Sequence, residues 1–157
     1  MKLTHLTLCF TTLALSSCSS CEDDHAAAAG GSQITFAPVL GVDLATMAKT
    51  PSGAWYKDLT AGDGAPVGAG KHVAIHYDGR LPNGARFDVN GPTDQPFAFV
   101  LGVGAVVRGF DEGVAGMKVG GRRLVVIPPE LGYGPQGNGP VPPNATLVFT
   151  IELVSAR

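Results

Sequence analysis

Cysteine is nearly absent from this chain of 157 residues, which has only Cys9, Cys18 and Cys21. Residues 22–157 therefore contain no thiol, and this excludes both a disulfide framework and a catalytic cysteine there. Blocks of basic residues are also lacking, since 11 Lys and Arg against 13 Asp and Glu give a net charge of -2. Nucleic-acid binding needs a strongly basic surface, so we expect no nucleic-acid partner.

Long hydrophobic runs are lacking as well, because no stretch approaches the roughly 20 apolar residues that span a bilayer. Residues 1–15, MKLTHLTLCFTTLAL, have an early Lys followed by an uncharged stretch, which is typical of an export signal. Residues 15–18 read LSSC and resemble the bacterial lipobox, whose cysteine is lipidated. We expect a lipoprotein signal peptide over residues 1–17 and a lipid on Cys18. The alternatives are an ordinary secretory signal and lipidation of Cys21.

Polar and small residues follow the proposed anchor, in the sequence EDDHAAAAGGS at 22–32. They have no apolar period to bury, so residues 18–52 are interpreted as a flexible tether and a variable N-terminal extension, with the folded domain over 53–157. A lipid anchor with a tether predicts a location in the cell envelope, facing the periplasm. Ser19 stands where enteric lipoproteins retained in the inner membrane often have Asp, so the outer membrane is preferred.

Glycine and proline are abundant, with 22 Gly and 12 Pro that interrupt short apolar runs. This pattern is typical of a β-rich domain with many turns. Strands are predicted over 54–60, 72–78, 97–101, 122–127 and 146–154. The Asn83-Gly84 step favours a tight turn after the second of them.

Only residues 107–117, VRGFDEGVAGM, predict a helix. Phe110, Val114 and Met117 share one face, and Asp111 and Glu112 suit the positive end of the helix dipole. Three glycines would make this helix unstable in isolation, so packing must hold it. The predicted fold class is therefore α+β, an antiparallel sheet wrapped over one short helix.

Two histidines, His72 and His76, lie on one predicted strand. At about 3.3 Å per residue they are about 13 Å apart, which is too far for one ion to bridge. His76 is better interpreted as a buried histidine with a hydrogen-bond partner. We expect neither a metal nor a cofactor.

Seven segments follow one another along the chain: WYKDL, VAIHYDG, LPNGARFD, PFAFVLG, VVRGFDEGVAGM, VGGRRLVVIPPELGYG and PPNATLVFTIEL. Their order and spacing resemble those of the FKBP family of peptidyl-prolyl cis-trans isomerases, over about two thirds of the chain. Seven motifs in register are far more specific than any one alone. The resemblance implies a half-barrel of antiparallel strands around a short helix, in agreement with the α+β interpretation.

The resemblance also implies one apolar cavity surrounded by Tyr77, Phe87, Asp88, Phe97, Val106, Val107, Phe110, Tyr133 and Phe149. Phe99 is a further candidate for the wall, with a place in the core as the alternative. The family commonly has Trp at the cavity floor, where this chain has Phe110. The smaller ring should deepen the cavity, and binding of macrolide inhibitors of the tacrolimus and rapamycin class should depend on it more than catalysis does.

The implied activity is rotation about Xaa-Pro amide bonds in unfolded or nascent exported polypeptides. The barrier is about 18–20 kcal/mol because resonance gives the C–N bond double-bond character. An apolar cavity disfavours the dipolar planar amide relative to the twisted one. The backbone N–H of Val107 and the hydroxyl of Tyr133 are expected to orient the substrate, with Asp88 as a polar rim group. The alternative function is a non-catalytic holdase or binding module that uses the same groove.

Overall fold

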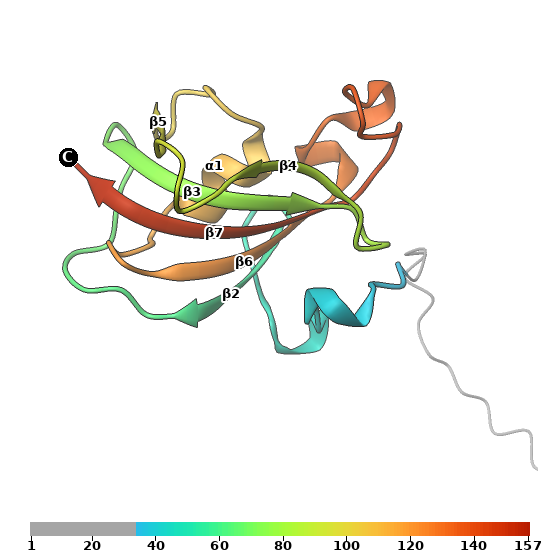
Figure 1. Ribbon diagram of the computed structural model, residues 1–157, viewed down its shortest axis with the longest axis horizontal. Helices are drawn as coiled ribbons and strands as arrows, with labels where there is room; N and C mark the ends of the chain where they lie inside the picture. Colours follow the sequence, from blue (N-terminus) through green and yellow to red (C-terminus); the bar gives the residue numbers. More distant parts are fainter. Residues whose placement is uncertain (1–33) are drawn as a thin grey trace, which may run out of the picture. The chain divides into compact units, whose positions relative to one another are not determined.

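The computed structural model describes residues 34–157 (Figure 1). The predicted signal peptide over 1–17, the lipidation candidates Cys18 and Cys21, and the segment 22–32 lie outside the described residues. Within residues 34–157, no helix is long and apolar enough to cross a membrane.

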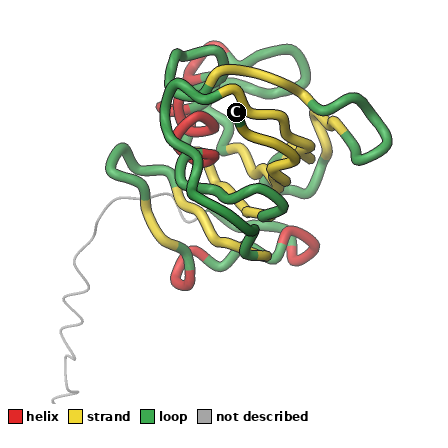
Figure 2. Tube along the Cα trace, turned by 90° about the vertical axis from the view of Figure 1, so that its left-hand side faces the viewer, coloured by secondary structure: helices red, strands yellow, loops and turns green. Residues whose placement is uncertain are grey.

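Seven strands form one antiparallel sheet in the order β1-β2-β6-β7-β3-β4, and β5 also pairs with β3. The strands are β1 (Ala48–Lys49), β2 (Trp55–Thr60), β3 (His72–Arg80), β4 (Arg86–Asn90), β5 (Phe97–Val100), β6 (Arg122–Ile127) and β7 (Leu147–Ala156). One helix, α1 (Arg108–Val114), and four 3-10 turns, Pro38–Leu40, Leu44–Thr46, Pro129–Leu131 and Gly134–Gln136, complete the described chain. The predicted α+β class and all five predicted strands are confirmed, while β1 and β4 were not predicted. Figure 2 shows how much of the chain lies in loops between the strands.

The central strand β7 pairs with β6 on one side and with β3 on the other. Its first residues, Leu147, Val148 and Phe149, are all buried, which a strand with one face in water would not allow. Further along, Ile151 is buried and Glu152 is exposed, so alternation returns. The first half of β7 is therefore covered on both faces of the sheet.

One face of the sheet at β6 and β7 is covered by the N-terminal extension. Leu124, Val126 and Val148 form a small buried cluster, and the partly buried apolar side chains packed on it are Phe36, Leu40, Val42, Leu44, Met47 and Trp55. The described part of the segment predicted as a flexible tether and extension, 18–52, thus packs on the sheet. The described residues, 34–157, all belong to one compact unit.

The other cover is α1, which is shorter than the predicted 107–117. Phe110 and Val114 are buried as expected, and Met117 is buried just beyond the helix, after Gly116 turns the chain with φ +77°. A Cβ on Gly113 would lie 2.7 Å from Cγ1 of Val125 on β6. This glycine therefore lowers helix propensity but lets the helix approach the sheet closely.

Arg123 fixes the end of α1 to the sheet, although it is an arginine with 6% exposure. Its Nη1 donates hydrogen bonds of 3.0 Å to the carbonyl oxygens of Gly113 and Ala115. Its Nε donates to Asp58 at 2.6 Å, and its guanidinium lies 4.6 Å from the centre of the Tyr56 ring. The buried charge is thus paired and hydrogen-bonded, as burial requires.

Candidate active site

A cavity of about 430 Å³ lies between α1 and the helix-facing side of the sheet. It is lined by Tyr77, Asp88, Phe97, Ala105, Val106, Val107, Phe110, Tyr133 and Phe149. These residues come from β3, β4, β5, the loop before α1, α1, the loop after β6, and β7. The structure therefore brings together eight of the nine residues that the resemblance named.

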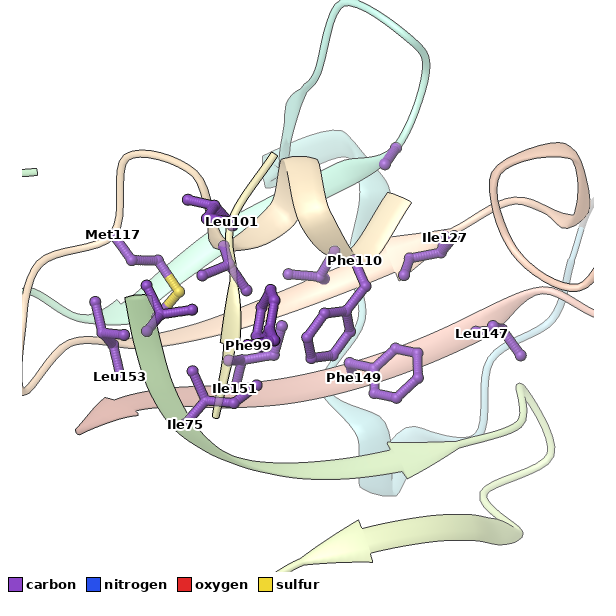
Figure 3. Packing of buried hydrophobic residues seen from close by; sticks show 14 of the residues in the cluster. Ile75, Phe99, Leu101, Phe110, Met117, Ile127, Leu147, Phe149, Ile151 and Leu153 are labelled. Carbon is purple, nitrogen blue, oxygen red and sulfur yellow. The ribbon is translucent and has the colours of Figure 1, made fainter. Parts of the chain in front are cut away.

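The floor of the cavity consists of two buried aromatic rings, Phe110 from α1 and Phe149 from β7, each 4% exposed. Their centroids are 4.9 Å apart at an interplanar angle of 84°, and Figure 3 shows the two rings beside each other. Tyr77 contacts both rings edge-on, at 5.9 Å from Phe110 and 6.1 Å from Phe149. Edge-to-face pairs of this kind stabilise each other beyond simple burial, so the three rings support one another at the bottom of the cavity.

Phe87, the ninth predicted residue, does not line the cavity. Its ring lies 5.4 Å from that of Phe149, edge-on, and covers Gly79, where a Cβ would be 2.9 Å from the Phe87 ring. Phe87 thus supports the cavity wall from behind. A side chain at residue 79 would displace it.

Phe99 belongs to the core, because it is 8% exposed and stacks on Phe97 at 5.6 Å. Phe97 itself is 39% exposed and forms the mouth of the cavity. Ala105 also lines the cavity, and sequence reasoning missed it. A small loop residue carries no chemical signal of its own, and only its place beside Val106 could have indicated it.

The polar side of the cavity is a pair formed by Tyr77 and Asp88. The Tyr77 hydroxyl donates a 2.9 Å hydrogen bond to Oδ2 of Asp88, whose Oδ1 accepts a 2.9 Å bond from the backbone N–H of Val89. Burial, together with the hydrogen bond to Asp88 and its negative charge, raises the pKa of Tyr77 to about 12. Tyr77 is thus a protonated donor at neutral pH, and both carboxylate oxygens are already engaged.

Two other donors at the cavity are uncommitted. Val107 precedes α1 in an extended conformation, and its carbonyl accepts from the N–H groups of Phe110 and Asp111 at 2.9 and 3.1 Å. Its own N–H has no acceptor among residues 34–157, and the same holds for the hydroxyl of Tyr133 in that part of the chain. A bound molecule can therefore receive hydrogen bonds from both.

The two histidines considered as metal ligands lie apart from this cavity. Nδ1 of the half-buried His76 is 2.9 Å from Oδ1 of Asn90, and the Asn90 amide nitrogen donates to the carbonyl of Gln95. Since that donation leaves the Asn90 oxygen as the acceptor, His76 donates from Nδ1. In the described part of the chain, no group of three or more His, Cys, Asp or Glu side chains is arranged to hold a metal ion.

The cavity thus has aromatic and aliphatic walls, one carboxylate committed to a tyrosine, and two free donors. It contains no Ser, Cys, Lys or His that could act as a nucleophile. Such a site can remove water from a neutral, apolar group and orient its carbonyl oxygens.

Comparison with known proteins identifies the same family that the sequence motifs resemble. Residues 64–154 match the profile of the FKBP-type peptidyl-prolyl cis-trans isomerase family. An FK506-binding protein of Neisseria meningitidis serogroup A is 48% identical over 99 residues, which are 62% of this chain and 91% of that protein. FK506-binding protein 4 of Dictyostelium discoideum is 51% identical over 106 residues, 67% of this chain, but only 29% of its own length is covered.

Solved structures agree with the sequence relatives. FkpA from Escherichia coli superposes with a TM-score of 0.65 at 36% identity, over 71% of this chain and 51% of that one. AtFKBP13 gives a TM-score of 0.65 at 35% identity, over 71% of this chain and 98% of that one. The family profile thus covers most of the domain, and solved structures superpose on the same part of the chain. The chain therefore belongs to the family of FKBP-type peptidyl-prolyl cis-trans isomerases.

Proposed function

We propose that the aromatic cavity is where this isomerase rotates Xaa-Pro bonds, by desolvation and orientation rather than by covalent chemistry. The observation that carries the proposal is an apolar floor of Phe110 and Phe149 beside two uncommitted donors, the Val107 N–H and the Tyr133 hydroxyl. The prolyl ring enters the apolar part of the cavity. The donors hold carbonyl oxygens of the flanking residues.

Desolvation lowers the barrier because the ground-state amide is dipolar and planar, and loses much of that charge separation when it twists. Inside apolar walls the planar form loses more hydration energy than the twisted form, so the roughly 18–20 kcal/mol barrier falls. Orientation lowers the barrier further, because a substrate carbonyl that is hydrogen-bonded to Val107 or Tyr133 has already lost the entropy that reaching the reactive geometry would cost. Asp88 contributes indirectly by holding Tyr77 in the wall.

The proposed substrates are proline-containing polypeptides in the course of folding after export. This part of the proposal is supported by residues 1–17, which have the features of a lipoprotein signal peptide and are followed by Cys18. We place the domain on the periplasmic side of the envelope, on a lipid anchor, with the outer membrane preferred. Uncatalysed isomerisation takes about 10–100 s at 25 °C, long enough for a catalyst to matter to a folding chain.

Macrolides of the FK506 class are proposed as ligands of the same cavity. Two relatives carry the name FK506-binding protein, and the cavity is apolar with donors at its mouth. Phe110 at the floor leaves more room than an indole would. We therefore expect binding to be weaker than in relatives with Trp there.

A proline-limited refolding assay tests the proposed site. The wild type is expected to accelerate refolding, and Tyr133→Phe should lower kcat/KM by about 2- to 10-fold, the effect of losing one hydrogen bond. Phe87→Ala should also lower it, because the wall behind Phe149 loses its support. If both variants keep the wild-type rate, the cavity is not the site. If the wild type binds the unfolded chain without accelerating refolding, the domain is a holdase.

Labelling with a radioactive fatty acid tests the anchor. The wild type should incorporate the label, and Cys18→Ala should abolish it. Label retained in Cys18→Ala but lost in Cys21→Ala would move the lipid to Cys21. No label in the wild type would leave an ordinary secretory signal.

A further inference from the structure

The wall of the cavity that carries Asp88 belongs to an edge strand. β4 pairs with β3 alone, and their register shifts between Gly79 and Arg80, opposite Phe87. Edge strands lack a second neighbour and open more easily than central ones. The positions of Phe87 and Asp88 therefore depend on whatever else holds the β3–β4 hairpin.

The N-terminal segment contacts this hairpin at its turn. The backbone N–H of Ala37 donates a 2.7 Å hydrogen bond to the carbonyl of Pro82. Gly84, with φ +87°, lies so close that a Cβ there would be 3.3 Å from Val39 and 3.4 Å from Ala37. Figure 1 shows the first described residues beside the turn that joins β3 and β4.

The same segment is fixed to the central strands of the sheet. Phe36 and Leu40 pack with Val42, Leu44 and Met47 on the buried cluster of Leu124, Val126 and Val148, which belongs to β6 and β7. A segment held at one end by the most buried strands and hydrogen-bonded to the edge hairpin limits the movement of that hairpin. The profile match begins only at residue 64, so the segment lies outside the residues that define the family.

We infer that residues 34–40 form a brace that positions the β3–β4 hairpin, and with it Phe87 and Asp88, for isomerisation. Ala37 is the positioning residue, through its N–H, and Phe36 holds it in place. The inference rests on the proposed use of the cavity. It makes the N-terminal extension a working part of the isomerase rather than only a tether.

Ala37→Pro tests the brace by breaking its contact with the hairpin turn. The φ of Ala37 is -61°, which proline adopts, but the proline Cδ would replace the N–H that points at the Pro82 carbonyl oxygen 2.7 Å away, so the substitution removes the donor and pushes the two segments apart. We expect kcat/KM for a Xaa-Pro peptide to fall by at least about 2- to 10-fold, the effect of one lost hydrogen bond. Amide hydrogen exchange over residues 81–90 should become faster, while exchange in β6 and β7 stays the same.

Phe36→Ala is the second variant, in case the proline prevents folding, and it should have the same two effects. Leu44→Ala is the matched control, because Leu44 packs on the same cluster but lies in the 3-10 turn next to β1. It should lower the free energy of unfolding without changing kcat/KM or exchange over residues 81–90. All measurements are made where every variant is fully folded.

Two results would overturn the brace. One is unchanged kcat/KM and unchanged exchange over 81–90 in both Ala37→Pro and Phe36→Ala. The other is a loss of kcat/KM in Leu44→Ala as large as theirs, which would make the effect one of stability alone. Faster exchange over 81–90 with unchanged kcat/KM would leave the brace in place structurally and contradict the role proposed for the cavity wall. Failure of the brace can therefore be distinguished from failure of the function proposed for the cavity.

Discussion

Tyr77 and Asp88 share a 2.9 Å hydrogen bond in which the phenol of β3 is the donor and the carboxylate of β4 is the acceptor. The bond joins a half-buried ring of the cavity wall to an exposed group on the edge strand. It explains why an acidic residue belongs to an apolar site: the carboxylate fixes the orientation of the tyrosine ring that contacts Phe110 and Phe149.

Asp88→Ala should lower the pKa of Tyr77 from about 12, but not to its ordinary value of 10.0, because burial is the largest cause and remains. The folded-state pKa lies above the unfolded one, so the stabilisation from protonated Tyr77 is complete below pH 10 and is lost as the pH rises towards 12. NMR titration of ring-labelled tyrosine measures the pKa. Asp94→Ala, in the exposed turn after β4, should leave it unchanged. An unaltered value in Asp88→Ala would contradict the role of the pair.

Phe110→Trp should fill the floor of the cavity. The larger ring adds apolar contact to a bound macrolide worth about 1 kcal/mol, so FK506 should bind roughly fivefold more tightly by calorimetric titration. Turnover should change by less than about threefold. Phe99→Trp is the matched control, because Phe99 lies in packed core and the larger ring should cost about 1–3 kcal/mol of stability. Weaker FK506 binding in Phe110→Trp would show that the floor has no spare room.

Arg123→Ala should destabilise the domain by about 3 kcal/mol, because the carbonyls of Gly113 and Ala115 lose their donor and the ring of Tyr56 loses its cover. Arg122→Ala is the control, since the neighbouring arginine is exposed and should cost less than about 0.5 kcal/mol. Urea denaturation gives both values. Equal effects would mean that the end of α1 is not held by Arg123.

Gly113→Ala should be destabilising by about 1–3 kcal/mol, although alanine is the better helix former by about 1 kcal/mol. The added Cβ would meet Val125 at 2.7 Å and push α1, with Phe110, away from β6. Gly68→Ala is the control, because a Cβ there meets nothing within 4 Å. A stabilised Gly113→Ala variant would show that the helix can move without cost.

The sequence predicted the long elements of this fold correctly for a simple reason. In β3 the buried side chains of Val73 and Ile75 alternate with less buried neighbours, and local alternation is visible without knowledge of the partners. β4 has the sequence RFDVN, with two charges in five residues, and becomes a strand only because β3 supplies its partner. The two residues of β1 are likewise defined by β2.

The candidate site divides in the same way. Motif register placed eight residues around one cavity, but it could not separate Phe87, which stands behind Phe149, from the residues in front. It also could not show whether Phe99 faces the cavity or the core, since an aromatic side chain has the same residue type in either place. Whether an aromatic ring faces the cavity or the core depends on tertiary packing, which motif register does not describe.

The sequence by itself therefore determined the class of fold, the family and the chemical character of the cavity, because these follow from local patterns and motif order. Tertiary structure alone decided the length of α1, the close contact of Gly113 with β6, and the packing of residues 34–47 on the outer face of the sheet. Each of these depends on a contact between segments distant in the chain. No local pattern in the sequence encodes such a contact.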